Sequence, residues 1–363
     1  MNLLSSQNLI IPDPLKLDSY QKARQVVLDT FKDFEDLVGI YEFGRVNNPG
    51  ISDLDLAFAF KGKPKDPETG RKFADRKLPA AIDKILSGST LMVFSEEQIK
   101  DLLIWDDLKL TCLYGNEVKL NAPSDPKLRT VAQIMDWLPE RLLSLKKQLA
   151  SPTIPIIRFL GILHSLNYTF EKLLSEKVMR DHKQETFSKH IQNVSSMRKN
   201  FFEYKDNETE LRNKLDLLCK SAFELGLEAM KATSDWMKKK EFYQVQDAEN
   251  SDWGEFHLSP KSRTSGYRFT KDRHPPPLWA QPDDFYIPVP EIWAVHWKSY
   301  GEEPGVISSK VAQALTQFSR ISGKIHPELN HLLKNRIRLC NSMADFLYEN
   351  GFKRGLYKFG WFF

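Results

Sequence analysis

Two aspartates separated by one leucine, Asp53-Leu54-Asp55, are the residues of this chain best suited to chemistry. They follow a glycine turn and open an apolar run, in which side chains alternate between the two faces of a strand. Asp53 and Asp55 therefore share one face with small residues, and the opposite face carries Leu54, Leu56, Phe58 and Phe60. At a rise of about 3.3 Å per residue, the two aspartate Cα atoms lie about 6.6 Å apart. Parallel carboxylates at that spacing can hold two divalent ions, about 3.5–4 Å apart, beside a phosphate.

The elements that position this pair are predicted from hydrophobic periodicity. Apolar residues at helical spacing follow Asp18 or Ser19 as an N-cap and predict an amphipathic helix as far as Leu37. The next residues, Val38 to Phe43, are rich in strand formers and end at Gly44. A turn, with one helical turn in it, then leads into the strand that we expect to begin at Asp53.

Further short elements complete a small mixed α/β domain. Residues 61–70 contain two Gly, two Pro and three Lys and predict an exposed loop. The elements expected after it are a helix at about Phe73 to Leu86, a strand at Thr90 to Phe94, a short helix at Glu96 to Leu103 and a strand at Leu108 to Tyr114. Strands and helices that alternate in this way favour a sheet covered by helices.

The length of 363 residues favours two domains. A Pro-containing segment, Asn121 to Pro126, marks the expected boundary, and helical periodicity dominates beyond it. We therefore predict the α+β class, with a small α/β domain at residues 1–122 and a mostly α-helical domain at residues 123–363. Its expected helices are residues 129–149, 155–176, 185–202, 207–239, 307–321 and 327–350. Residues 241–305, rich in Pro and aromatic residues, are expected to form a long loop region.

The composition is that of a folded protein, with 41% hydrophobic and 28% charged residues and a net charge of +4. The pI of about 8.7 suits phosphate-bearing ligands but does not by itself indicate a nucleic-acid-binding surface. The three cysteines form no CxxC pair, so neither a zinc site nor a disulfide framework is indicated. A basic leader and a stretch of about 20 apolar residues are both missing, which predicts a cytoplasmic protein without membrane contact.

The order of helix, strand, glycine turn and Asp-x-Asp strand over residues 18–120 resembles the catalytic core of the polymerase-β-like nucleotidyltransferase superfamily. Phe43-Gly44 and Asp53-Leu54-Asp55-Leu56 match its motif. The resemblance implies transfer of a nucleoside monophosphate from an NTP such as ATP to a hydroxyl acceptor on RNA, a protein or a small molecule. It also implies two Mg²⁺ ions, with Asp53 and Asp55 as catalytic metal ligands and Gly44, Arg45 and Ser52 as nucleotide-binding residues. Gly44 would let backbone amides approach the phosphates, and a helix N-terminus after the turn would add a favourable dipole.

Two departures from the motif support an alternative. Arg45 stands where the family usually has Gly or Ser, and neither of the later strands carries a third carboxylate. Glu96 and Asp107, at strand ends, are the candidates for that third ligand. The alternative is a catalytically degenerate nucleotidyltransferase-like module for binding or assembly, with RNA among its candidate ligands.

Two other groups of residues suggest nucleic-acid chemistry more weakly. The segment from Lys261 to Arg273 alternates basic and aromatic residues, which suits phosphate contacts with base stacking but equally a solvated loop. Arg158 and His164 on a predicted helix resemble the ribonuclease motif of HEPN domains, yet an i, i+6 pair lies about 240° apart around a helix. The sequence indicates neither the acceptor nor the oligomeric state.

Overall fold

The computed structural model describes two compact units of the chain. The first, the α/β unit, comprises the described residues between 13 and 129 together with those between 332 and 352. The second, the helical unit, comprises the described residues up to 12 and those between 130 and 331. The described residues are 3–4, 6–66, 68–86, 91–104, 109–122, 129–130, 134, 138, 141–142, 144–146, 148–149, 151–179, 181–239, 279–280, 287–288, 331–332, 335, 339, 342, 346 and 349–352.

Helices and mixed sheets occur together in the chain, in agreement with the predicted α+β class. The division into domains at residues 122 and 123 stays a prediction, because residues 123–128 lie outside the described part of the chain.

The α/β unit is built on a four-stranded sheet of order β4-β3-β2-β5. The strands are β2 (Leu37–Phe43), β3 (Asp55–Phe60), β4 (Leu91–Ser95) and β5 (Leu110–Gly115). β2 is antiparallel to both β3 and β5, whereas β3 and β4 are parallel. All four predicted strands are confirmed, although β3 begins at Asp55 rather than Asp53.

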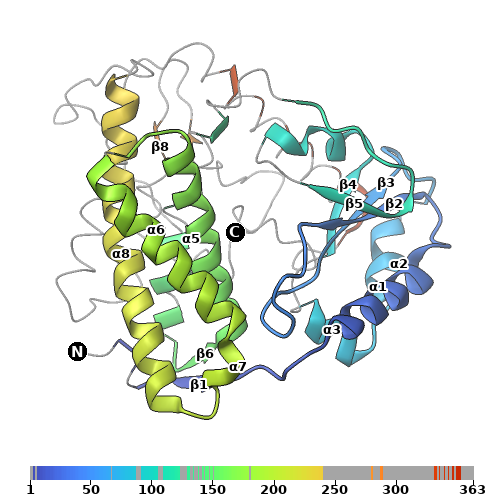
Figure 1. Cartoon of the computed structure of the whole chain (residues 1–363). Coiled ribbons are helices and arrows are strands. Elements are labelled where there is room, and N and C mark those ends of the chain that lie inside the picture. The colour runs from blue at the N-terminus through green and yellow to red at the C-terminus, as the bar shows by residue number, and fades with distance from the viewer. Residues whose placement is uncertain are drawn as a thin grey trace. The chain divides into compact units, whose positions relative to one another are not determined.

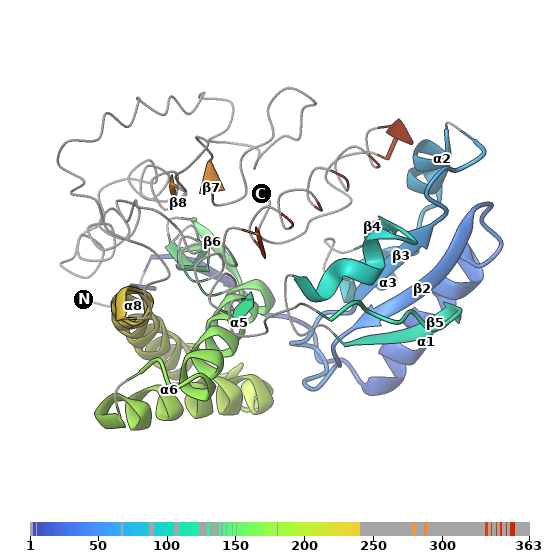
Figure 2. The same ribbon diagram turned by 90° about the horizontal axis from the view of Figure 1, so that it is seen from above.

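Helix α1 (Leu17–Phe31) covers one face of this sheet (Figure 2). The prediction of a single helix from Phe73 to Leu86 is wrong. The chain forms two shorter helices there, α2 (Thr69–Asp75) and α3 (Ala80–Ile85). Pro79 is the N-cap residue of α3 and disfavours helical geometry at the residue before it, so it separates the two. The short helix expected near Glu96 is a 3₁₀ helix, η1 (Gln98–Ile104).

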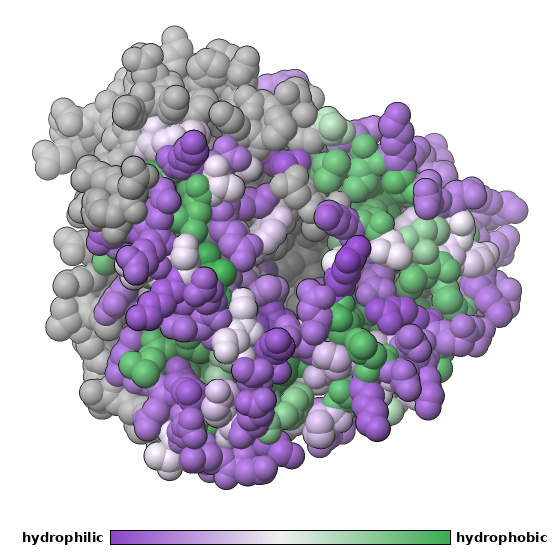
Figure 3. Space-filling view, in the orientation of Figure 1, coloured by the Kyte–Doolittle hydropathy of each residue, from purple (hydrophilic) through white to green (hydrophobic). Residues whose placement is uncertain are grey.

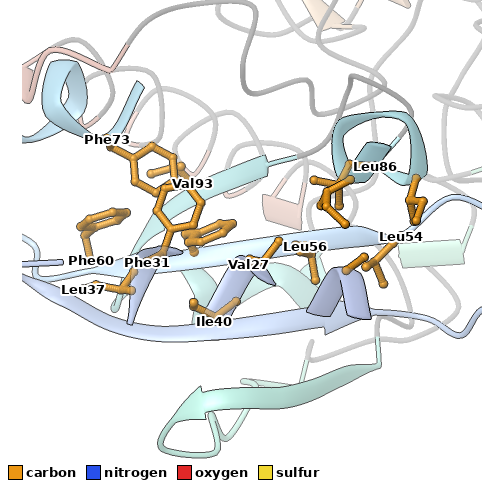
Figure 4. Close-up of a cluster of buried hydrophobic side chains, with 14 of the residues drawn as sticks. Val27, Phe31, Leu37, Ile40, Leu54, Leu56, Phe60, Phe73, Leu86 and Val93 are labelled. Atoms are coloured by element: carbon orange, nitrogen blue, oxygen red, sulfur yellow. The ribbon is translucent and has the colours of Figure 1, made fainter. Parts of the chain in front are cut away.

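Between α1 and the sheet lies a dense apolar core (Figure 4). Leu54 lies near Leu86 at one end of this cluster, and Phe60 lies near Phe73 at the other. The aromatic rings pack mostly edge to face, as in the pair of Phe60 and Phe73 with centroids 5.5 Å apart. The buried alternate residues of β3 therefore form the core side of the sheet, as the sequence pattern predicts.

The other side of β3 is also covered along most of its length, which the sequence pattern did not predict. Ala57 and Ala59 are 0% exposed. Their neighbours in register include Tyr41 on β2 and Phe94 on β4, both buried. Only the beginning of the strand, at the aspartates, reaches solvent on this side.

A distant segment completes the same core. Phe346 and Phe352 belong to the apolar cluster, and the ring of Phe352 lies 5.2 Å from that of Phe60. The amide of Gly70 donates to the carbonyl of Asn350 at 2.8 Å. The α/β unit thus contains residues from beyond the predicted boundary at residue 122.

The helical unit contains the long helices α5 (Ile156–Ser175), α6 (Asp181–Lys199) and α8 (Glu208–Lys239), which lie side by side (Figures 1 and 2). The short α7 (Phe201–Tyr204) packs against α8. Strand β1 (Asn8–Ile10) pairs in parallel with β6 (Thr153–Pro155), and the amide of Leu3 donates to the carboxylate of Asp216 at 2.6 Å. The N-terminal segment is therefore part of this unit.

The predicted helices at residues 155–176, 185–202 and 207–239 are confirmed within a few residues. Those at 129–149 and 327–350 are helical at the positions that the structure describes, except that Asn350 lies in a turn, and the one at 307–321 lies outside the described residues. Of the predicted loop at 241–305, the structure describes only β7 (Trp279–Ala280) and β8 (Ile287–Pro288), which pair antiparallel.

Among the described helices, none is both long enough and apolar enough to cross a lipid bilayer. The face shown in Figure 3 is mostly hydrophilic, with apolar residues in smaller groups.

Candidate functional site

Asp55 is the first residue of β3, a central strand of the four-stranded sheet, and Asp53 comes two residues before it. Asp53 is exposed and Asp55 is half-buried, while Leu54 between them is 0% exposed and belongs to the core. The amide of Leu54 donates to the carbonyl of Ile85 at 3.3 Å, at the end of α3. The buried leucine anchors this segment to the core, and the two aspartates that flank it are the more exposed positions.

Gly44 lies at the same end of the sheet, since its neighbour Phe43 pairs with Asp55 across β2 and β3. Its φ of +67° is a conformation that glycine adopts without steric cost. No atom lies within 4 Å of the position that a Cβ would take, so the backbone conformation rather than the space requires glycine. The amide of Gly44 donates to the carbonyl of Lys109 at 3.2 Å and belongs to the sheet. Amides that contact a phosphate must therefore come from the residues after Gly44.

A single turn, Asn48 to Ser52, occupies the connection between β2 and β3. The amides of Ile51 and Ser52 both donate to the carbonyl of Asn48, at 3.0 and 2.7 Å. Residues 44–54 contain no helix, so the predicted helix N-terminus is wrong and no helix dipole acts from this connection. The turn is too short to propagate, because Gly50, with φ of +84°, leaves the helical region.

Ser52 is part of this turn. Its hydroxyl accepts a hydrogen bond from the Asn48 amide at 3.2 Å, and the residue is buried. This contact stabilises the turn, and nucleotide binding by Ser52 stays a prediction.

Arg45 is exposed at the edge of the site. Among the described residues, no ion-pair partner of its guanidinium lies within 4.0 Å. A planar cation directly after Gly44 can contact phosphate oxygens through paired hydrogen bonds.

Two other carboxylates of the sheet region, Glu96 and Glu117, lie at its far end. The amide of Glu96 donates to the carbonyl of Phe60 at 2.8 Å, at the end of β3. Phe60 is five positions after Asp55 along the strand, about 17 Å at the usual rise. Glu117 follows Gly115, which pairs with Gly39 at the same far end. The prediction of Glu96 as third metal ligand is therefore wrong, because parallel pairing of β3 and β4 carries it away from the aspartates.

Asp107, the other candidate, lies outside the described residues. Within the described part of the chain, no group of three or more His, Cys, Asp or Glu side chains is arranged to hold a metal ion.

Helix α1 contributes two residues that sequence reasoning missed. The hydroxyl of Tyr20 contacts the backbone of the turn before Asp53, and the guanidinium of Arg24 binds both carboxylate oxygens of Glu42, at 2.6 and 2.7 Å. Glu42 is the residue before Phe43 and lies on the core side of β2, opposite Leu56. A glutamate at a core position of an apolar strand needs a cation nearby, and that signal in the sequence could have identified Arg24.

The remaining predicted candidates fall elsewhere. Arg158 and His164 are both exposed on α5, and the basic-aromatic segment from Lys261 to Arg273 lies outside the described residues.

Comparison of the chain with models of protein families, with curated proteins and with solved structures found no match in any of the three. Its function is therefore inferred from its own residues.

Proposed function

We propose that this chain is a metal-dependent nucleotidyltransferase, which moves a nucleoside monophosphate from an NTP to a hydroxyl acceptor. The supporting observation is the joint placement of Asp53 and Asp55 at the beginning of a central strand, beside the left-handed Gly44 that ends the neighbouring strand. This is the end of the sheet at which the resemblance to polymerase-β-like enzymes locates the chemistry.

The donor set fits magnesium. Two carboxylates supply the hard oxygen ligands that Mg²⁺ prefers, and one of them, Asp53, is exposed to solvent. Asp53 and Asp55 would hold the ions. Bound there, Mg²⁺ would neutralise the triphosphate and lower the pKa of the acceptor hydroxyl.

The remaining steps of the transfer would involve the acceptor, the NTP and Arg45. The acceptor oxygen forms a bond to the α-phosphorus, the bond from that phosphorus to the bridging oxygen breaks, and pyrophosphate leaves while the acceptor proton passes to solvent. Arg45, exposed beside Gly44, would contact the negative phosphate oxygens and orient the triphosphate. No covalent intermediate with the protein is needed.

The positions of Glu96 and Glu117 favour a second candidate. Both lie at the far end of the sheet, so neither of these described residues adds a third carboxylate to Asp53 and Asp55, where active members of the family commonly have three. The second candidate is a degenerate nucleotidyltransferase-like module that binds a ligand without transferring a nucleotide.

Transfer of label to an acceptor distinguishes the two. The full chain, with Mg²⁺, is supplied with each of the four NTPs labelled at the α-phosphate and with RNA, protein and small hydroxylated acceptors. We expect incorporation that falls at least about 100-fold in Asp53→Asn and in Asp55→Asn, the loss that several kcal/mol of charge stabilisation implies.

The matched control is Asp75→Asn. Asp75 is an exposed aspartate in the last turn of α2, outside the site, and its replacement should leave incorporation unchanged. Absence of incorporation with every NTP would favour the degenerate module.

A further inference from the structure

The phenol of Tyr20 joins two points of the turn that precedes Asp53. Its oxygen accepts a hydrogen bond from the amide of Gly50 at 2.9 Å and donates to the carbonyl of Ser52 at 2.6 Å. Tyr20 is only 1% exposed, so water does not compete for these bonds. One buried hydroxyl thus holds two residues of the same turn, Gly50 and Ser52, through short hydrogen bonds.

These bonds act directly on the backbone of Asp53. The carbonyl of Ser52 and the amide of Asp53 belong to one peptide plane, so an anchor on that carbonyl restrains the orientation of the plane. On its other side Asp53 is held by Leu54, whose side chain lies in the core. The exposed aspartate is therefore restrained before and after its own position.

The electrostatics of the phenol agree with this geometry. Burial raises the pKa of Tyr20, the hydrogen bond from Gly50 acts in the opposite direction, and the negative charge of Asp53 raises the pKa further. The phenol stays neutral at physiological pH and keeps its proton for the Ser52 carbonyl.

Helix α1 holds the other half of the site one turn later. Arg24, four residues after Tyr20, binds Glu42 at the end of β2, just before Gly44. Residues four apart lie on one face of a helix. The same face of α1 therefore fixes the strand end that carries Gly44 and the turn that delivers Asp53.

We propose that Tyr20 is a positioning residue for Asp53: its two hydrogen bonds hold the turn in the conformation that presents this carboxylate for metal and nucleotide binding. The consequence for metal binding rests on the proposed function, whereas the restraint on the turn does not.

The test compares Tyr20→Phe with Tyr41→Phe in the full chain. Both variants lose one phenol oxygen and keep the ring. The hydroxyl of Tyr41 donates to the carbonyl of Asn116 at 2.9 Å, after the end of β5 and away from the turn. Any effect of losing a buried hydroxyl in general appears in both variants, and a positioning effect appears only in the first.

The first readout is amide hydrogen exchange of residues 48–53. In Tyr20→Phe the amide of Gly50 loses its acceptor, and we expect exchange about five- to tenfold faster, the factor that corresponds to one net hydrogen bond. Tyr41→Phe should leave exchange in this segment unchanged. Unchanged exchange in Tyr20→Phe overturns the proposal.

The second readout is the Mg²⁺ concentration that gives half-maximal nucleotide incorporation. We expect it to rise about five- to tenfold in Tyr20→Phe, by the same hydrogen-bond loss, and to stay at the wild-type value in Tyr41→Phe. Faster exchange with an unchanged Mg²⁺ requirement overturns the proposal, because the turn would then not determine metal binding. If the wild-type chain transfers no nucleotide, the proposed function fails and the exchange readout alone decides whether Tyr20 holds the turn.

Discussion

At the scale of single residues, the ion pair of Arg24 and Glu42 joins α1 to β2 beside the site. The carboxylate side chain of Glu42 is 7% exposed and accepts two hydrogen bonds from one guanidinium. A buried carboxylate that loses its cation keeps its desolvation cost without the compensating attraction. The pair therefore stabilises the contact of α1 with β2, because each charged group compensates the charge of the other.

Replacement of Arg24 by Met therefore should lower the free energy of unfolding by about 2–4 kcal/mol, less than for a fully buried pair because Arg24 is partly exposed. Urea unfolding measures the change. Glu68→Gln is the control: Glu68 pairs with Arg71, and both side chains are more than half exposed, at 52% and 63%. Its loss should cost less than about 0.5 kcal/mol. Equal losses of unfolding free energy in Arg24→Met and Glu68→Gln would contradict the conclusion that the buried pair of Arg24 and Glu42 stabilises the fold more than an exposed pair does.

Gly44 and Gly115 offer a second comparison at this scale. Both have positive φ, +67° and +86°, but a Cβ at Gly44 would meet open space while one at Gly115 would lie 2.1 Å from the carbonyl oxygen of Val38. Gly44→Ala should cost about 1–2 kcal/mol of unfolding free energy from backbone strain alone. Gly115→Ala should cost clearly more, because the sheet edge must also shift. The reverse order in urea unfolding would show that Gly44 is sterically confined.

At the scale of elements, the sequence predicted the strands well and the connections poorly. Apolar runs such as Val38 to Phe43 determine strands locally, so β2, β4 and β5 are found within two residues of the predicted ranges. The turn between Gly44 and Asp53 makes two hydrogen bonds to Tyr20, about 30 residues earlier, and no local pattern contains that information. The predicted helical turn there is accordingly a non-helical turn. The location of Glu96 likewise depended on the direction of β4, which periodicity does not specify.

A buried histidine, His190, lies where α5, α6 and α8 pack together, and its protonation should make stability depend on pH. His190 on α6 is 2% exposed, its ring lies 5.7 Å from that of Phe170, and its Nδ1 is 3.0 Å from the hydroxyl oxygen of Ser221. Burial lowers the pKa of His190 to about 4, below its ordinary value of 6.5. The unfolded chain thus binds a proton that the folded chain excludes between these two values.

Stability should therefore be fully present above pH 6.5 and fall as the pH decreases towards 4, with His190 contributing up to about 3 kcal/mol to the change. The measurement is the free energy of unfolding of wild type and His190→Gln between pH 7 and pH 4. The difference in the free energy of unfolding between wild type and His190→Gln should become smaller as the pH falls. A constant difference would show that His190 titrates normally in the folded protein.

At the scale of the whole molecule, each unit contains a segment from the opposite end of the chain. Residues near the N-terminus, such as Leu9 in β1, belong to the helical unit, and Phe346 and Phe352 belong to the core of the α/β unit. The sequence indicated a change from mixed to helical structure near residue 122, but contacts between residues almost 300 positions apart leave no local pattern. Composition and periodicity therefore predict the kinds of structure present and not which segments share a core.

Phe352 provides the test of this arrangement. Phe352→Ala should lower the free energy of unfolding by about 3 kcal/mol, the cost of removing a buried aromatic ring. Faster hydrogen exchange should appear in β3 and α2, whose Phe60 and Phe73 contact this ring. Leu217→Ala, at a residue that is 67% exposed, is the control and should change stability by less than about 0.5 kcal/mol. An unchanged stability of Phe352→Ala would mean that the N-terminal strands and helices form their core without the C-terminal segment.

The function proposed for the whole molecule depends on whether Asp53 and Asp55 together hold a metal-bound nucleotide. The measurement is the affinity of the full chain for each NTP with Mg²⁺ or Mn²⁺, compared with the Asp53→Asn, Asp55→Asn double variant in a protein of unchanged circular dichroism. We predict metal-dependent binding in the wild type that weakens at least about tenfold in the double variant, a loss of about 1.4 kcal/mol or more. Equal affinity in the two proteins, or no binding with either metal, would contradict the assignment of these aspartates as metal ligands.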